Sequence, residues 1–206
     1  PALVVGFRGE AALLTALRSL IDPRPRVLCF TQGHGEAPVD SYDDKGYGLI
    51  ADEARRDGYQ VRALEPKSLL GAGLGSCRVL VIGGPRRAFA DPEVEGLERF
   101  LRSGGRLLLL IGPVLDRRVT RHRAVGLEPL MARWGVSLPY KILVDGLQVP
   151  GEQPLLTWGT RQGYADHPAV RSVAGRITVW PLAREVRPVP GTLAGLTSVP
   201  LIATSD

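Results

Sequence analysis

Residues 26–36, RVLCFTQGHGE, decide the fold that we expect for this chain. The segment begins with a short apolar run and stops abruptly at a polar turn that two glycines bracket, and a helix-like segment follows. Such a pattern is typical of a buried parallel strand in an open α/β sheet, whose carboxyl edge is where ligands bind. The turn contains His34 and Glu36, so this edge is the first candidate for a functional site.

The same alternation continues on both sides of this segment. Strands are expected at residues 2–7, 60–64, 78–82 and 106–111, and helices at residues 10–21, 41–57 and 91–102. Asp91 is the expected N-cap of the last helix, with Pro92 and acidic residues in its first turn. The run RLLLLI at residues 106–111 reads as a further buried strand. This order predicts a doubly wound, mainly parallel α/β sheet.

The regular pattern weakens after residue 115. A short helix is expected within residues 127–134 and strands at residues 141–144 and 177–180, while residues 149–168 and 187–206 are rich in proline and glycine. We therefore expect a single α/β domain with a regular core, residues 1–115, and an irregular C-terminal portion, residues 116–206.

The composition is that of a globular protein, with 44% hydrophobic and 23% charged residues among 206. Scattered arginines account for most of the net charge of +5, which indicates a solvated surface rather than a nucleic-acid partner. No apolar run approaches the roughly 18 residues that span a bilayer. The first residue is proline rather than methionine, so we interpret the chain as a fragment of a longer protein.

The two cysteines, Cys29 and Cys77, do not form a disulfide framework or a CxxC pair. Cys29 lies inside an apolar strand and is expected to be a small buried hydrophobic residue. Cys77 stands at the start of another strand. Whether the two cysteines pair stays open, because their separation in sequence does not fix their distance in space.

Two interpretations of the turn at residues 33–36 compete. His34 and Glu36 are suitable for general acid–base catalysis or metal binding. However, the spacing of His122 and His167 does not place either with His34, so we expect no metal site. In the structural interpretation, which we favour, the glycines allow a tight turn in which His34 bonds to neighbouring backbone.

Other segments lack the signatures of common enzymes. The glycines near Gly84 and Gly112 belong to no phosphate-binding motif, and Pro85 removes a backbone donor that a phosphate would need. No serine or cysteine nucleophile follows the strand at residues 106–111, which argues against a hydrolase or an amidotransferase. The sequence DHP at residues 166–168 reads as a loop turn, and residues 117–123 as a basic loop at the same edge.

The motifs RVLCF-TQGHGE, VLVIGGP and LERFLRSGGRLLLLIGP, followed by WGV and HP, stand in a familiar order. Residues 3–181 resemble the auxiliary-component family of ABC-type transport systems associated with gliding motility. The resemblance implies an extracytoplasmic, flavodoxin-like or class I glutamine amidotransferase-like domain without catalytic residues or a cofactor. It also implies a membrane-tethered protein that works beside an ABC permease and ATPase on the periplasmic side of a bacterial inner membrane.

We therefore expect a non-catalytic binding or scaffolding domain whose partner is the permease or another membrane subunit. Its expected interaction surface comprises Gly33, His34, Gly35, Glu36, Tyr42, Gly84, Pro85 and Asp116. One alternative is a hydrolase or sugar-processing enzyme with His34 and Glu36 as acid and base. Another is a small-ligand or carbohydrate sensor that uses Tyr42, Tyr47 and Trp158. Residues 42–47 either line a cleft at this edge or form the solvated start of a helix.

Overall fold

The computed structural model describes residues 9–21, 25–115, 122–144, 156–159, 161–191 and 193–204. The chain divides into two compact units, Pro1–Leu110 and Ile111–Asp206. Whether they form a single domain stays a prediction. The strand expected at residues 2–7 lies outside the described residues.

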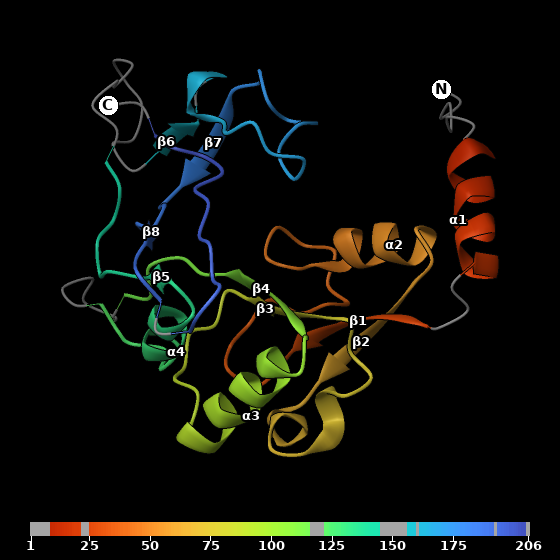
Figure 1. Ribbon diagram of the computed structural model, residues 1–206, viewed down its shortest axis with the longest axis horizontal. Helices are drawn as coiled ribbons and strands as arrows, with labels where there is room; N and C mark the ends of the chain where they lie inside the picture. The colour runs from red at the N-terminus through yellow and green to blue at the C-terminus, as the bar shows by residue number, and fades with distance from the viewer. Residues whose placement is uncertain are drawn as a thin grey trace. The chain divides into compact units, whose positions relative to one another are not determined.

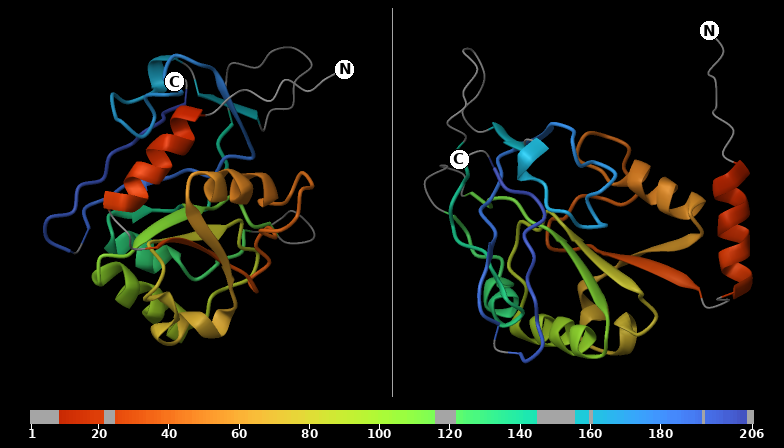
Figure 2. Two further views of the ribbon diagram at one scale, coloured as in Figure 1. Left: turned by 90° about the vertical axis from the view of Figure 1, so that its right-hand side faces the viewer. Right: turned by 45° about the horizontal axis from the view of Figure 1, so that its top comes forward.

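The first unit contains a four-stranded parallel sheet. Its strands are β1 (Arg26–Thr31), β2 (Tyr59–Leu64), β3 (Val79–Gly83) and β4 (Arg106–Leu110), in the spatial order β2-β1-β3-β4. Helix α2 (Gly48–Arg56) covers one face, and α3 (Asp91–Arg102) lies on the opposite face with the short 3₁₀-helices η1 (Pro66–Leu69) and η2 (Ala72–Leu74) (Figures 1 and 2). The expected α/β fold with a parallel sheet is confirmed.

The central strands β1 and β3 are buried because both of their faces are covered. On the α2 face, Phe30 and Val81 pack with Ala51 in one hydrophobic cluster. Since successive side chains of a strand point to opposite faces, Cys29 and Leu80 lie on the other face, where both are fully buried. These two faces explain why β1 and β3 read as continuous apolar runs in the sequence.

The two cysteines form a disulfide whose Cα atoms are 5.8 Å apart. Cys29 lies in the middle of β1, and the backbone N–H of Arg78 donates to the carbonyl of Val27 at 2.8 Å, which holds Cys77 beside β1. Cys29 is buried as expected, but as half of a disulfide rather than as a small free residue. The parallel pairing of β1 with β3 brings together two cysteines that are 48 residues apart in sequence.

Three expectations for the first unit were wrong in detail. Helix α2 begins at Gly48 rather than residue 41, because the N–H groups of Tyr47 and Gly48 bond to the carbonyls of Pro38 and Ser41 and close a turn there. The N-cap of α3 is Ala90 rather than Asp91. Strand β4 is an edge strand whose side chains alternate between half-buried and exposed, and is not buried throughout.

Helix α1 (Gly9–Ile21) was expected at residues 10–21 and forms there. Its apolar residues Leu13, Leu17 and Leu20 are exposed. Nowhere in the described part of the chain is there a helix long and apolar enough to cross a membrane.

The second unit is built from short elements. Helix α4 (Glu128–Arg133) and 3₁₀-helix η3 (Arg161–Gly163) accompany two antiparallel strand pairs, β5 (Val136–Ser137) with β8 (Arg187–Pro188) and β6 (Leu156–Gly159) with β7 (Thr178–Pro181). The expected short helix corresponds to α4 and the strand at residues 177–180 to β7. The strand expected at residues 141–144 is absent from the described residues there, which form only an isolated bridge between Ile142 and Arg184.

Candidate functional site

The turn after β1 depends on two glycines with left-handed backbone. Gly33 has a φ of 114° and Gly35 a φ of 80°, a region that other residues rarely adopt. A β-carbon on Gly33 would also lie 2.5 Å from Cγ of Pro66. The backbone of this turn therefore requires glycine at both positions, as the structural interpretation of the sequence expected.

His34 is buried between two carboxylates. Its Nε2 lies 3.1 Å from Oε2 of Glu93, and its Nδ1 lies 3.4 Å from Oε1 of Glu36. The imidazole also stacks on Phe89 with ring centroids 3.8 Å apart and an interplanar angle of 16°. We call Glu36, His34 and Glu93 the Glu–His–Glu cluster. Its histidine is 6% exposed, so solvent hardly reaches the ring.

Backbone hydrogen bonds close the cluster on the remaining sides. The N–H of His34 donates to Oε2 of Glu36 at 2.6 Å, and the N–H of Ala90 donates to Oε2 of Glu93 at 2.7 Å. The carbonyl of His34 accepts from the N–H groups of Arg86 and Arg87, each at 2.8 Å. The cluster therefore ties the turn after β1 to the loop after β3 and to the start of α3.

This arrangement favours a structural role for His34 and Glu36. A general acid or base must come within hydrogen-bonding distance of the substrate, whereas both side chains here are enclosed by protein. Among the described residues, no group of three or more histidine, cysteine or acidic side chains is placed to hold a metal ion. The Glu–His–Glu cluster thus joins segments of the fold and does not present an acid–base pair to a ligand.

Sequence reasoning missed Glu93 and Phe89 as partners of His34. The pattern at the start of α3 did indicate acidic residues in the first helical turn, and Glu93 supports that turn by accepting the N–H of Ala90. Its second contact, with His34, spans 59 residues and had no signal in the sequence.

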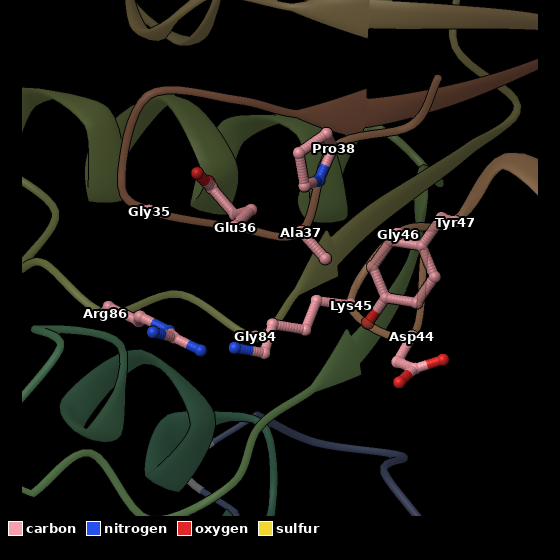
Figure 3. A pocket seen from close by; sticks show the side chains of 10 residues that line it. All are labelled: Gly35, Glu36, Ala37, Pro38, Asp44, Lys45, Gly46, Tyr47, Gly84 and Arg86. Atoms are coloured by element: carbon pink, nitrogen blue, oxygen red, sulfur yellow. The ribbon is translucent and has the colours of Figure 1, made fainter. Parts of the chain in front are cut away.

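A pocket of about 440 Å³ lies at the carboxyl edge of the sheet, next to the cluster (Figure 3). It is lined by Gly35, Glu36, Ala37, Pro38, Asp44, Lys45, Gly46, Tyr47, Gly84 and Arg86. These residues come from the turn after β1, the segment before α2 and the loop after β3. Partial burial raises the pKa of Tyr47, whose ring lies 5.9 Å from that of Phe30. We call this the edge pocket.

The structure separates the other expected surface residues. Gly84 lines the edge pocket, whereas Pro85 is buried. Tyr42 is exposed, and its hydroxyl donates to Oδ2 of Asp52 at 2.9 Å, which raises the pKa of Tyr42 and lowers that of Asp52. Asp116 lies outside the described residues. A binding role for any of these residues stays a prediction.

The remaining histidines and Trp158 belong to the second unit. Burial lowers the pKa of His122, with a smaller contribution from the charge of Arg184. His167 accepts a hydrogen bond from the N–H of Ala169 at its Nδ1, as expected for a loop turn. Trp158 lies on β6 and lines a separate pocket of the second unit.

Comparison with known proteins gives a family and a fold. A family model described as "ABC-type uncharacterized transport system" matches residues 25–206. The solved structure "mmIFT52 N-terminal domain" is similar with a TM-score of 0.60 at 18% sequence identity, over 79% of this chain and 68% of that chain. At this identity the likeness shows the fold alone. No curated protein matches the chain.

Proposed function

The chain belongs to the family described as ABC-type uncharacterized transport system, and from this premise we propose that it is a non-catalytic binding domain of an ABC-transporter auxiliary protein. The domain acts through the carboxyl edge of the sheet, where the turns after β1 and β3 meet. The observation that carries the proposal is the Glu–His–Glu cluster. It encloses the only histidine of the first unit's described residues inside the protein and leaves an open pocket beside it.

The proposal places this domain on the extracytoplasmic side of the membrane, in the periplasm. The Cys29–Cys77 disulfide supports this location, because disulfides persist in oxidising compartments and are rare in the cytosol. In this proposal the longer protein is tethered to the membrane, and the partner is the permease or another membrane subunit. An association with gliding motility and a fold similar to flavodoxin-like or class I glutamine amidotransferase-like domains belong to the same proposal.

The structure argues against the alternative of a hydrolase or sugar-processing enzyme. Its acid and base would be His34 and Glu36, and Glu36 has no exposed side-chain surface. Its nucleophile would be expected after a central strand, and neither residues 32–38 after β1 nor residues 84–90 after β3 contain serine or cysteine. Catalysis at the carboxyl edge would need an accessible acid–base pair and a nucleophile, whereas binding needs neither. We therefore favour binding over catalysis at this edge.

Site-specific photo-crosslinking in the full-length protein tests the proposed surface. In the test variant a photoreactive residue replaces Arg87, which is exposed in the loop after β3. In the matched control it replaces Arg102, which is exposed at the opposite edge of the sheet. We expect a crosslink to a membrane subunit of the transporter from position 87 and none from position 102. Crosslinks from position 102 alone would contradict the proposed surface.

Thiol trapping in intact cells tests the proposed compartment. Whole cells are quenched with acid, and alkylation of the denatured protein is expected to leave both cysteines unmodified unless a reductant is added first, because the disulfide leaves no free thiol. Full alkylation of both cysteines without reductant would place the domain in a reducing compartment.

A further inference from the structure

We infer that the edge pocket binds a small organic anion, with a phosphate or carboxylate group held between Lys45 and Arg86. The inference rests on the proposed binding function and adds the chemical class of the ligand. It is carried by the position of the pocket in the sheet, by two cationic side chains that form no ion pair with the described residues, and by the orientation of the acidic side chains.

The edge pocket lies at the topological switch point of the sheet. From β1 the chain continues to β2 on one side, and from β3 it continues to β4 on the other side. The two connections diverge and leave a crevice outside the carboxyl ends of β1 and β3, where open α/β sheets bind their ligands. Gly35 and Gly84, which follow these two strands, both line the edge pocket.

Two cationic side chains enter the edge pocket from different segments. Lys45 precedes α2 and Arg86 follows β3, and their charged ends point toward one another (Figure 3). No acidic side chain in the described part of the chain forms an ion pair with either, whereas Arg55 on α2 and Arg102 on α3 each pair with a carboxylate. Because two converging like charges repel, an anion between them would be stabilised by both.

The acidic side chains of the edge pocket do not neutralise these cations. The carboxylate of Glu36 points away from the ends of Lys45 and Arg86 and is engaged with His34 (Figure 3). The carboxylate of Asp44 also points away from the gap between the two cations (Figure 3). The positive charge in the gap is therefore available to a ligand.

The dimensions of the edge pocket suit an organic ligand rather than a bare ion. Its volume of about 440 Å³ lies within the range of small-molecule sites. The ring of Tyr47 forms part of the wall, and Gly35 and Gly84 present backbone without side chains. An arginine guanidinium binds phosphate or carboxylate oxygens with two parallel hydrogen bonds, and lysine adds a point charge. The expected ligand thus carries one such group on a small body.

Calorimetric titration of the protein with matched probes tests the inference. Glucose 6-phosphate and glucuronate represent the two anionic groups, inorganic phosphate lacks the organic body, and glucose lacks the charge. Arg86→Gln and Lys45→Gln each remove one cation from an exposed side chain, so both variants should fold. Arg87→Gln is the matched control, because Arg87 is the exposed neighbour that does not line the pocket.

We expect at least one of the two sugar anions to bind and glucose not to bind. The Kd should rise roughly tenfold to a hundredfold in each pocket variant, the cost of losing one charge-assisted hydrogen bond, and stay unchanged in Arg87→Gln. Flotation with phosphatidylglycerol vesicles, against phosphatidylcholine vesicles, distinguishes a lipid headgroup from a soluble anion as the source of the same chemistry. Headgroup binding that both pocket variants weaken would support the inference for a lipid source.

Three results would overturn the inference: equal binding of glucose, an equal loss of binding in Arg87→Gln, or no binding of any probe or vesicle. Failure here is distinguishable from failure of the proposed function. The photo-crosslink from position 87 to a membrane subunit does not require a ligand in the edge pocket.

Discussion

Replacing His34 with alanine should destabilise the first unit strongly. The substitution removes the imidazole between Glu36 and Glu93 and leaves two buried carboxylates without that partner. Leaving a buried acceptor without its hydrogen-bond partner costs about 1–3 kcal/mol, and losing the stacked contact with Phe89 adds about 0.5–1.5 kcal/mol. Since the carboxylates keep their backbone N–H donors, we expect a total loss of about 2–4 kcal/mol.

Urea unfolding followed by circular dichroism measures this loss as a lower midpoint at unchanged slope. Amide hydrogen exchange gives a local reading at Arg86 and Arg87, whose N–H groups donate to the carbonyl of His34 and should exchange faster in the variant. A double-mutant cycle of His34→Ala with Glu93→Gln isolates the contact between the two side chains. His167→Ala is a control substitution of a histidine that accepts one local hydrogen bond, from the N–H of Ala169. It should lower the free energy of unfolding by less than about 1 kcal/mol.

A His34→Ala variant whose free energy of unfolding falls by less than about 1 kcal/mol would refute the structural role of His34. Removing a buried imidazole that contacts Glu93 and stacks on Phe89 should cost more than that. If the variant kept its stability but lost transporter-dependent function, His34 would instead have a direct functional role. A coupling energy near zero in the double-mutant cycle would show that the 3.1 Å contact between His34 and Glu93 contributes nothing to stability.

Two further predictions concern the disulfide and the exposed tyrosine. Replacing both Cys29 and Cys77 with alanine should lower the free energy of unfolding by about 4 kcal/mol, from the entropy of a closed loop of about 48 residues. Reductant should weaken the wild type and leave the double variant unchanged; equal sensitivity of both proteins would contradict this role. Tyr42→Phe should raise the pKa of Asp52, because the Tyr42 hydroxyl is the main group that lowers it. The lowered pKa of Asp52 contributes stability above the ordinary aspartate pKa, and this contribution disappears as the pH falls through the folded-state pKa. The Tyr42→Phe variant should therefore begin to lose this stability at a higher pH than the wild type. An NMR titration that finds the Asp52 pKa unchanged in the variant would refute the assignment.

The sequence predicted the parallel core because its signal is local. Apolar runs that end at glycine turns, separated by amphipathic segments, need only the chain itself to be recognised, and β1, β3 and α3 form where the pattern indicated. The position of β4 was misjudged because RLLLL has the same composition whether the strand is central or at an edge. The crossover connections decide which strands are neighbours, and the sequence of β4 does not indicate its place in the sheet.

The candidate site was predictable only in part, for a similar physical reason. Gly33 and Gly35 signalled the tight turn, and a structural role for His34 was the favoured interpretation. The pairing of His34 with Glu93 and the Cys29–Cys77 disulfide depend on contacts across strands and helices that are distant in sequence. The edge pocket depends on Lys45 and Arg86 converging from two loops, and neither residue stands out in its own segment.

The Cys29–Cys77 disulfide also decides how the domain would respond to mechanical force. A pull on the two ends of the chain passes from β1 directly to the start of β3 through the covalent bond. The 48-residue loop that contains α2 and β2 is then shielded from the load, and about 160 Å of contour length cannot be drawn out while the bond is intact. In a single-molecule extension experiment the oxidised domain would therefore lengthen less than the reduced one, and the segment before α2 that carries Lys45 would remain outside the force path.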